Sequence, residues 1–207
     1  MRKPAPTSTR DTAADDRTRI LSGAQSHFLT HGFRNVTMDE LATELGMSKK
    51  TLYVHFQSKT ELLEAMLDFK LQHLQSDLEK LMAIPGIPFA ERLQRLLSGM
   101  RAHMEEIQPA FIRDVQRGDP KLFLRIQQAR KRLIHSCFGQ LLEEGRKAGA
   151  VRADIPVRLL IEMLVGAVDS MVQPARIDEL GITPKTAYAQ IVSVFLEGAL
   201  VRKEMTK

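Results

Sequence analysis

The sequence predicts an all-α protein, and three observations support this prediction. From Asp16 onward, apolar residues recur at the three- and four-residue spacing of helices, without the alternation of strands and without an internal repeat. Proline repeatedly stands near the expected start of a helix, where its missing N–H would have had no partner. Apolar residues make up 43% of the 207 residues, which is enough for a hydrophobic core. We expect about nine helices, divided between a small N-terminal domain and a larger body.

Residues 1–15 are expected to form a disordered basic arm. They contain two prolines, several threonines and three basic residues, but too few apolar residues to pack. Such an arm is most often solvated, although a basic arm can also lie in a DNA minor groove. Both interpretations stay open for this segment.

Residues 16–60 predict a domain of three short helices. In the first helix, Ile20, Ala24 and Phe28 recur every four residues and mark a buried face. Gly32 can then end this helix in a left-handed conformation. Because about 45 residues bury too little surface to be secure alone, we expect this domain to pack on the following helix.

The second and third helices of this domain have the layout of a helix-turn-helix. Thr37 and Glu40 have the spacing of a capping box, and Gly46 can turn the chain after the second helix. Ser48 can cap the third helix, whose Leu52 points inward. The other face carries lysines, hydroxyls and an aromatic ring, which can contact bases and phosphates in a major groove. Each of these residues alone could be a solvated surface side chain. The candidate DNA contacts are Thr37, Ser48, Lys49, Lys50, Thr51, Tyr53, His55 and Lys59.

The distribution of charge is consistent with a nucleic-acid partner. Residues 1–60 hold 9 Lys/Arg and 6 Asp/Glu, a net charge of +3, whereas the remaining 147 residues hold 21 and 19, a net charge of +2. The basic excess is therefore denser at the N-terminal end, as expected for an end that meets phosphates. A total of +5 is also ordinary for a protein of this size, so charge alone decides nothing.

The segment from Thr37 to Lys59, TMDELATELGMSKKTLYVHFQSK, resembles the helix-turn-helix signature of the TetR family of transcriptional regulators. The resemblance covers about residues 17–63, and TLYVHFQSK is its most diagnostic part. It implies an all-helical homodimer of nine helices per chain, with an N-terminal DNA-binding domain and a larger ligand-binding and dimerisation domain. It also implies repression of a nearby gene that a small molecule relieves. The family's DNA contacts map onto the eight candidates above, but Lys50 stands where the family often has a small residue, which leaves the operator sequence open.

A long helix is expected to join the N-terminal domain to the body. Leucines and methionines keep helical spacing from Leu62 to Leu81, and the run Pro85-Gly86-Ile87-Pro88 then breaks the pattern. A helix over residues 59–82 would span roughly 35 Å. The ligand-binding and dimerisation domain is assigned to residues 61–207. Its further helices are expected at about 88–105, 109–117, 120–147, 156–173 and 184–203.

The last two expected helices are apolar around more of their circumference than a helix on the surface of a monomer needs to be. Paired with their copies, they would form a four-helix bundle between two chains, and a palindromic operator suits a two-fold protein. The alternative is that both helices are wholly internal. The candidate dimer residues are Leu160, Met163, Leu164, Ala167, Met171, Tyr188, Ile191, Phe195 and Ala199.

The helices between these regions hold many methionines and phenylalanines, which suit a pliable apolar cavity or an ordinary core. We expect part of the set to line a pocket for a small, mainly hydrophobic effector. A basic run that includes Arg125, Arg130 and Arg132 is most simply a solvated face, although it could also meet a carboxylate or phosphate on a ligand. The candidate ligand-binding residues are Met100, His103, Met104, Ile107, Phe111, Phe123, Ile126, Ile134, Cys137 and Phe138.

Other classes of protein find little support in the sequence. One cysteine excludes an intramolecular disulfide, no apolar run reaches ~20 residues, and the first residues lack a signal-peptide core, so we expect a cytoplasmic protein. His27 and His31 have a metal-ligand spacing without a third ligand, and no catalytic or phosphate-loop motif occurs. We therefore expect no metal, no cofactor and no enzymatic activity. A DNA-binding factor without a small-molecule input, and more remotely a helical enzyme or carrier, remain as alternatives.

Overall fold

The computed structural model describes residues 9–105, 107–171 and 173–200, and these form ten α-helices. An isolated bridge between Val151 and Leu200 is the single β-type pairing among the described residues, so the predicted all-α class is confirmed. No helix in the described ranges is long and apolar enough to cross a membrane. The helices are α1 (Thr9–His31), α2 (Met38–Glu44), α3 (Lys49–His55), α4 (Lys59–Met82), α5 (Phe89–Glu105), α6 (Pro109–Gly118), α7 (Pro120–Lys147), α8 (Val157–Met171), α9 (Pro174–Leu180) and α10 (Pro184–Ala199).

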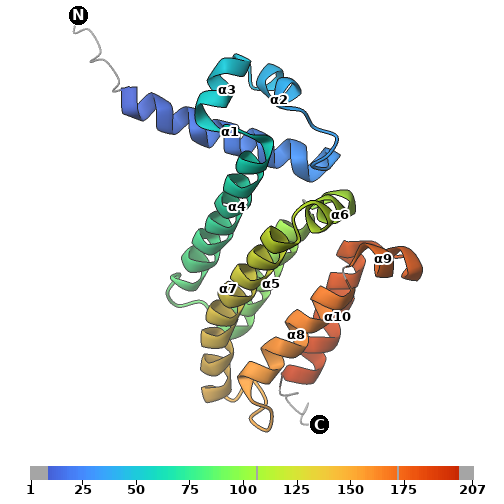
Figure 1. Cartoon of the computed structure of the whole chain (residues 1–207). Coiled ribbons are helices and arrows are strands. Elements are labelled where there is room, and N and C mark those ends of the chain that lie inside the picture. Colours follow the sequence, from blue (N-terminus) through green and yellow to red (C-terminus); the bar gives the residue numbers. More distant parts are fainter. Residues whose placement is uncertain (1–8, 106, 172, 201–207) are drawn as a thin grey trace, which may run out of the picture.

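Helices α1, α2 and α3 form a head at one end of the molecule, and α4 runs from it along the body (Figure 1). In the body, α5 and α7 lie against α4, and α8 and α10 pack together on the far side (Figure 1). Helix α6 lies at the top of the body, where it contacts α1 (Figure 1). The head therefore rests on two body elements, α4 and α6.

Two hydrophobic clusters make up the core, and α4 contributes to both. Leu63 and Met66, in its first half, pack with the head, with α6 and with the start of α7. Leu74 and Leu78, in its second half, pack with α5, α7, α8 and α10. This long helix therefore joins head to body, as the sequence predicts.

Local sequence signals account for most helix starts. The side chains of Ser58, Asp119 and Thr183 accept hydrogen bonds from backbone N–H groups in the first turns of α4, α7 and α10. Pro120 and Pro184 stand at the first positions of α7 and α10, where proline disrupts no helical hydrogen bond.

One prediction about the helices is wrong, and one short helix was not predicted. Helix α1 begins at Thr9, so residues 9–15 are helical and not part of a disordered arm; residues 1–8 lie outside the described residues. The alanines and early aspartates of this stretch favour a helix N-terminus even without an apolar face. The helix α9, in the predicted loop after α8, raises the number of helices to ten. At seven residues, α9 is too short to show an apolar period, although Pro174 and Gly181 bracket it.

Candidate nucleic-acid interface and ligand cavity

The turn between α2 and α3 fixes the angle at which α3 leaves the head. Gly46 has a φ of +61°, a left-handed conformation that glycine adopts without strain. The backbone N–H of Met47 then donates to the carbonyl of Ala42 over 3.0 Å. Leu52 and Phe56 are fully buried on the inner side of α3 and hold it against the head. Among the described residues, none packs over the opposite side of α3.

The outer face of α3 carries the predicted mixture of basic, hydroxyl and aromatic side chains. Lys49 and Lys50 are exposed, Tyr53 is 39% exposed, and Thr51 is half-buried. Val54 is 75% exposed and adds an apolar side chain to this face. His55, in the last turn, is half-buried and lies at the edge of this face.

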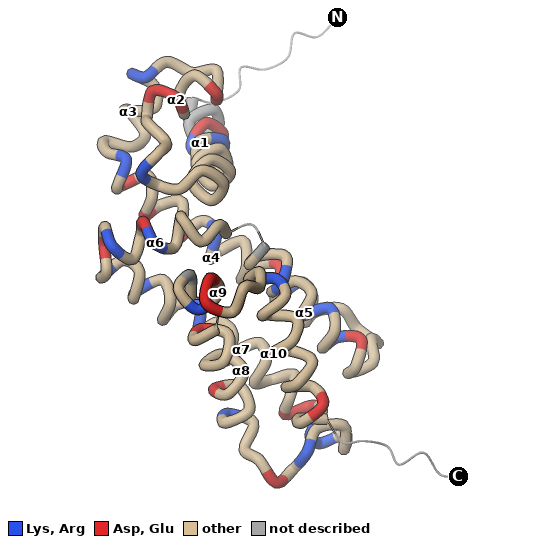
Figure 2. Tube along the Cα trace, turned by 90° about the vertical axis from the view of Figure 1, so that its right-hand side faces the viewer, with Lys and Arg blue, Asp and Glu red and all other residues tan. Residues whose placement is uncertain are grey.

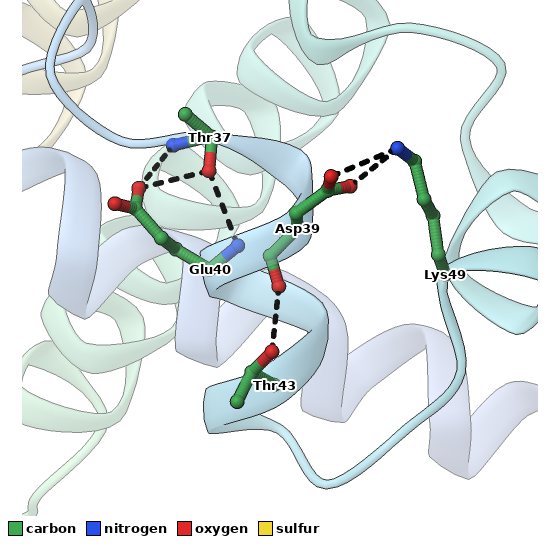
Figure 3. A network of polar contacts seen from close by, with 5 residues as sticks. All are labelled: Thr37, Asp39, Glu40, Thr43 and Lys49. Carbon is green, nitrogen blue, oxygen red and sulfur yellow. Dashed lines mark hydrogen bonds and ion pairs between the residues drawn. The ribbon is translucent and has the colours of Figure 1, made fainter.

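Acidic residues lie beside the basic ones in the head (Figure 2). The Lys49 ammonium forms an ion pair with Asp39 on α2, with N–O distances of 2.7 and 2.9 Å (Figure 3). The hydrogen bond from Lys49 to the Asp39 carboxylate raises the pKa of Lys49. Sequence reasoning missed Asp39, because nothing in a ten-residue separation indicates that the turn brings the two side chains together. The first lysine of α3 is therefore neutralised by a neighbour within the head.

Thr37 and Glu40 form the predicted capping box at the start of α2 (Figure 3). The Thr37 hydroxyl accepts from the backbone N–H of Glu40 over 3.1 Å, and the Glu40 carboxylate accepts from the backbone N–H of Thr37 over 2.8 Å. The latter bond lowers the pKa of Glu40. Thr37 remains exposed, so its side chain both fixes the helix start and lies at the surface.

The other two hydroxyl candidates are engaged with each other at the start of α3. The Ser48 hydroxyl accepts from the backbone N–H of Thr51 over 3.0 Å, and the two side-chain oxygens lie 2.8 Å apart. Lys59 lies apart from α3, at the start of α4, with its ammonium 4.4 Å from the centre of the Phe33 ring. Partial burial lowers the pKa of Lys59, and its ammonium donates to the carbonyl of Arg34 over 3.3 Å.

Helix α6 holds the loop between α1 and α2 by polar contacts that sequence reasoning did not predict. The backbone N–H of Arg34 donates to the Asp114 carboxylate over 2.9 Å, and the Arg34 guanidinium lies 3.9 Å from the other carboxylate oxygen. The backbone N–H of Gln108 donates to the carbonyl of Leu29 over 3.2 Å. Gly32 has a φ of +84°, and a side chain there would begin 3.1 Å from Asp114. The end of α1 is thus closely fitted to α6.

A cavity of about 150 Å³ lies under α6, between α4, α5, α7 and α8. Leu67 of α4 and Val115 of α6 contribute to its wall. Its polar lining consists of Gln127, Arg130, Asp169 and Gln173. Five candidate ligand residues line this cavity: Met104, Ile107, Phe111, Phe123 and Ile126. A narrow space of about 20 Å³ extends it and is lined by the candidates Met100, Ile134 and Phe138.

The two remaining ligand candidates point elsewhere. His103 faces α4, where its ring Nε2 lies 3.4 Å from the Asp77 carboxylate. Cys137 lines a separate surface groove between α4 and α7, and burial raises the pKa of its thiol. Neither residue lines the cavity under α6, because a helical pattern gives the period of the buried side and not the space that it faces.

The predicted dimer residues divide between the core and the surface. Leu160, Leu164, Tyr188 and Ala199 are buried in the core of the chain itself, so they offer little surface to a second chain. The Tyr188 hydroxyl donates to the carbonyl of Leu97 on α5 over 3.1 Å. Met163 is 55% and Met171 38% exposed, while the remaining three, Ala167, Ile191 and Phe195, are half-buried. The apolar face that α8 and α10 expose also includes Leu159 and Val194, which are 50% and 73% exposed.

Comparisons with known proteins agree with this geometry. Residues 20–66 match a family model described as bacterial regulatory proteins, tetR family. The chain is 26% identical over 200 residues to the HTH-type transcriptional regulator UidR of Escherichia coli (strain K12), covering 91% of this chain and 94% of UidR. It is 27% identical over 154 residues to the uncharacterized HTH-type transcriptional regulator YhgD of Bacillus subtilis (strain 168). This match covers 72% of this chain and 79% of YhgD. Its fold is similar to that of a putative transcriptional regulator from Saccharomonospora viridis, which was solved in complex with choline. The TM-score is 0.69 at 21% sequence identity, and the match covers 91% of this chain and 100% of the other.

Proposed function

Because this chain belongs to the TetR family of DNA-binding transcriptional regulators, we propose that it is a ligand-responsive repressor. In this proposal it binds a palindromic operator as a homodimer and is released by a small, mainly apolar molecule. The observation that carries the proposal is the cavity, whose wall includes both α4 and α6, the two body helices on which the head rests. A DNA-binding regulator of this kind would act in the cytoplasm, beside the chromosome.

The exposed face of α3 supports its role as the helix that enters the major groove. Its lysines can reach guanine acceptors or phosphates, and Tyr53 and the hydroxyls can bind phosphate oxygens. The methyl groups of Val54 and Thr51 can contact thymine methyl groups. The exposure of Val54 supports such an apolar contact, since the described residues offer it little else to pack on.

The apolar surface on α8 and α10 supports the homodimer. Leu159, Met163 and Val194 leave large apolar side chains in solvent, whereas residues on the other side of each helix, such as Leu160 and Tyr188, are buried in the core. Two copies related by a two-fold axis would cover these side chains with the same side chains of the partner. A two-fold dimer also presents two α3 helices to two successive major grooves, about 34 Å apart.

The contacts of α6 support a route by which a ligand acts on DNA binding. Phe111 and Val115 face the cavity, while Asp114, on the same helix, holds the backbone of Arg34 in the head. A ligand that displaces the wall at α6 therefore also moves the end of α1. Since both α3 helices must match the groove spacing at once, a small change in their separation disengages one of them. The cavity is also what favours this proposal over a DNA-binding factor without a small-molecule input.

The test begins with an operator selected from a random DNA pool by the purified protein. We expect Lys50→Ala to weaken binding to this duplex about five- to tenfold, because one contact to a base or phosphate is lost. Lys147→Ala is the matched control, since it removes the same charge from the exposed last turn of α7, far from α3, and should change affinity little. Equal losses for the two variants, or the absence of a selected sequence, would overturn the proposed DNA contacts.

A further inference from the structure

The cavity wall is electrically balanced. Among the described residues that line it, Arg130 and Asp169 are the ionisable ones, and they carry opposite charges. Arg130 comes from α7 and Asp169 from α8, and their side chains form an ion pair and hydrogen bond. The side chains are only 25% and 29% exposed, so the pair is largely withdrawn from water. All other lining residues are apolar or, like Gln127 and Gln173, neutral and polar.

This pair occupies the place where a ligand's polar group would lie. Both residues line the main cavity and also its narrow extension, so they stand at the junction of two apolar spaces. A guanidinium has five N–H donors and a carboxylate has two acceptor oxygens, so a single contact between them leaves hydrogen-bonding capacity on both. Gln127 lies one turn from Arg130 in the same wall, and Gln173 is anchored by a hydrogen bond to the Asp169 carbonyl over 2.8 Å.

The cavity has room for a single ring. An apolar protein cavity of about 150 Å³ is large enough for a molecule such as benzene, and this cavity has a similar volume. Phe111, Phe123 and Met104 in its wall favour contact with an aromatic ring through ring–ring and sulfur–ring interactions.

We propose that the effector is an uncharged molecule with a single ring and a polar group that both donates and accepts hydrogen bonds, seated against the Arg130–Asp169 pair. The inference rests on the proposed ligand-responsive function. A charged head group would add a net charge to a neutral, mainly apolar site. An anion that accepts from Arg130 would also be repelled by the nearby Asp169 carboxylate, and a cation that donates to Asp169 would be repelled by Arg130. An uncharged head can accept from Arg130 and donate to Asp169 while their ion pair stays intact.

Three probes of nearly equal size test the charge of the ligand directly: benzamide is neutral, benzoate is an anion and benzamidine is a cation. Calorimetric titration of the full-length protein should show benzamide binding at least about tenfold more tightly than either ion, a difference of 1.4 kcal/mol. Binding of benzoate or benzamidine as tightly as benzamide would overturn the proposal, as would the absence of binding by all three.

Two variants should each change which of the three probes binds most tightly, one in favour of the cation and the other in favour of the anion. Arg130→Met leaves the Asp169 carboxylate alone in the wall, so benzamidine should become the tightest of the three probes. Asp169→Asn leaves Arg130 alone, so benzoate should become the tightest. Arg125→Met is the matched control, because Arg125 lies on the same helix, pairs with Asp68 outside the cavity at 2.9 Å, and should leave the wild-type order unchanged.

The outcomes separate this inference from the proposed function. If a variant does not fold, as judged by circular dichroism, the order of the three probes on the wild-type protein still decides the charge of the ligand. Operator binding without any probe tests the DNA-binding proposal independently. A protein that binds its operator but prefers a charged probe would refute the inference alone.

Discussion

Asp39 competes with phosphate for Lys49, because its carboxylate lies 2.7 Å from the Lys49 ammonium. The pair is exposed, so it adds little to stability, but the carboxylate also repels any phosphate that approaches this end of α3. At the scale of single residues, the proposed DNA-binding face therefore combines an attractive charge with a nearby repulsive one.

We predict that Asp39→Asn strengthens binding to non-operator DNA about two- to fivefold at low salt and makes the salt dependence steeper by about one counterion. The melting temperature should change little. Fluorescence anisotropy on a scrambled duplex at several salt concentrations measures both quantities. Asp178→Asn on α9 is the control for net charge, and the same gain in affinity with that variant would show that Asp39 has no special role.

Tyr188 provides a second prediction at the residue scale, which concerns pH. Burial raises the pKa of its hydroxyl above the unfolded value of about 10. Above that pH the unfolded chain loses the proton while the folded chain keeps it, so Tyr188 destabilises the fold progressively as pH rises. Tyr188→Phe lacks this effect.

At neutral pH, Tyr188→Phe should be less stable by about 1 kcal/mol, because the hydrogen bond to Leu97 is lost. Urea denaturation should show this deficit shrinking between pH 8 and about pH 11. Tyr53→Phe is the control, since Tyr53 is exposed on α3. A deficit independent of pH would contradict the assigned cause.

At the scale of elements, α6 is the helix that contacts both the cavity and the head. Its apolar side lines the cavity, and Asp114 on its other side holds the loop that leads into α2. The sequence predicts α6 from Pro109 and its apolar spacing, but not the contact between Asp114 and Arg34, which are 80 residues apart. The spacing of apolar residues indicates which side of a helix is buried, but not which element packs against it.

We predict that Asp114→Ala weakens operator binding about threefold, because the Arg34 backbone loses its acceptor and the end of α1 is held less firmly. The ability of an effector to lower operator affinity should also fall, since α6 and the head are less tightly linked. Anisotropy titrations with and without effector measure both changes. Gln116→Ala, an exposed change on the same helix, should reproduce neither.

At the scale of the whole molecule, the proposed homodimer depends on the apolar face of α8 and α10. Met163 and Val194 are the most exposed of its large apolar side chains. We predict that the double variant Met163→Glu/Val194→Glu is monomeric by light scattering and binds a palindromic duplex at least about tenfold more weakly, because buried glutamates would repel across the two-fold axis.

Leu124→Glu is the control for this double variant, because Leu124 is 57% exposed on α7. It should keep the mass and the operator affinity of the wild-type protein. A double variant with the wild-type mass would place the dimer contact on another surface.

Features that depend on neighbours along the chain were predicted well. The capping box of Thr37, the turn at Gly46 and the inward side of α3 follow from residues within a few positions of one another. The same local signals carry the resemblance to a known family. The exposed side of α3 could be predicted for the same reason, since Leu52 and Phe56 define its buried side.

Contacts between helices could not be predicted from the sequence. Whether Leu160 and Tyr188 lie in the core or on a dimer face depends on the rotation of α8 and α10 against α5 and α7. The pairing of Arg130 with Asp169 and of Lys49 with Asp39 likewise depends on how two helices cross. An apolar period specifies that a helix has a buried side, but the packing of all the helices together chooses its neighbours, and so the spatial arrangement alone brought the charges of the cavity and of the head into contact.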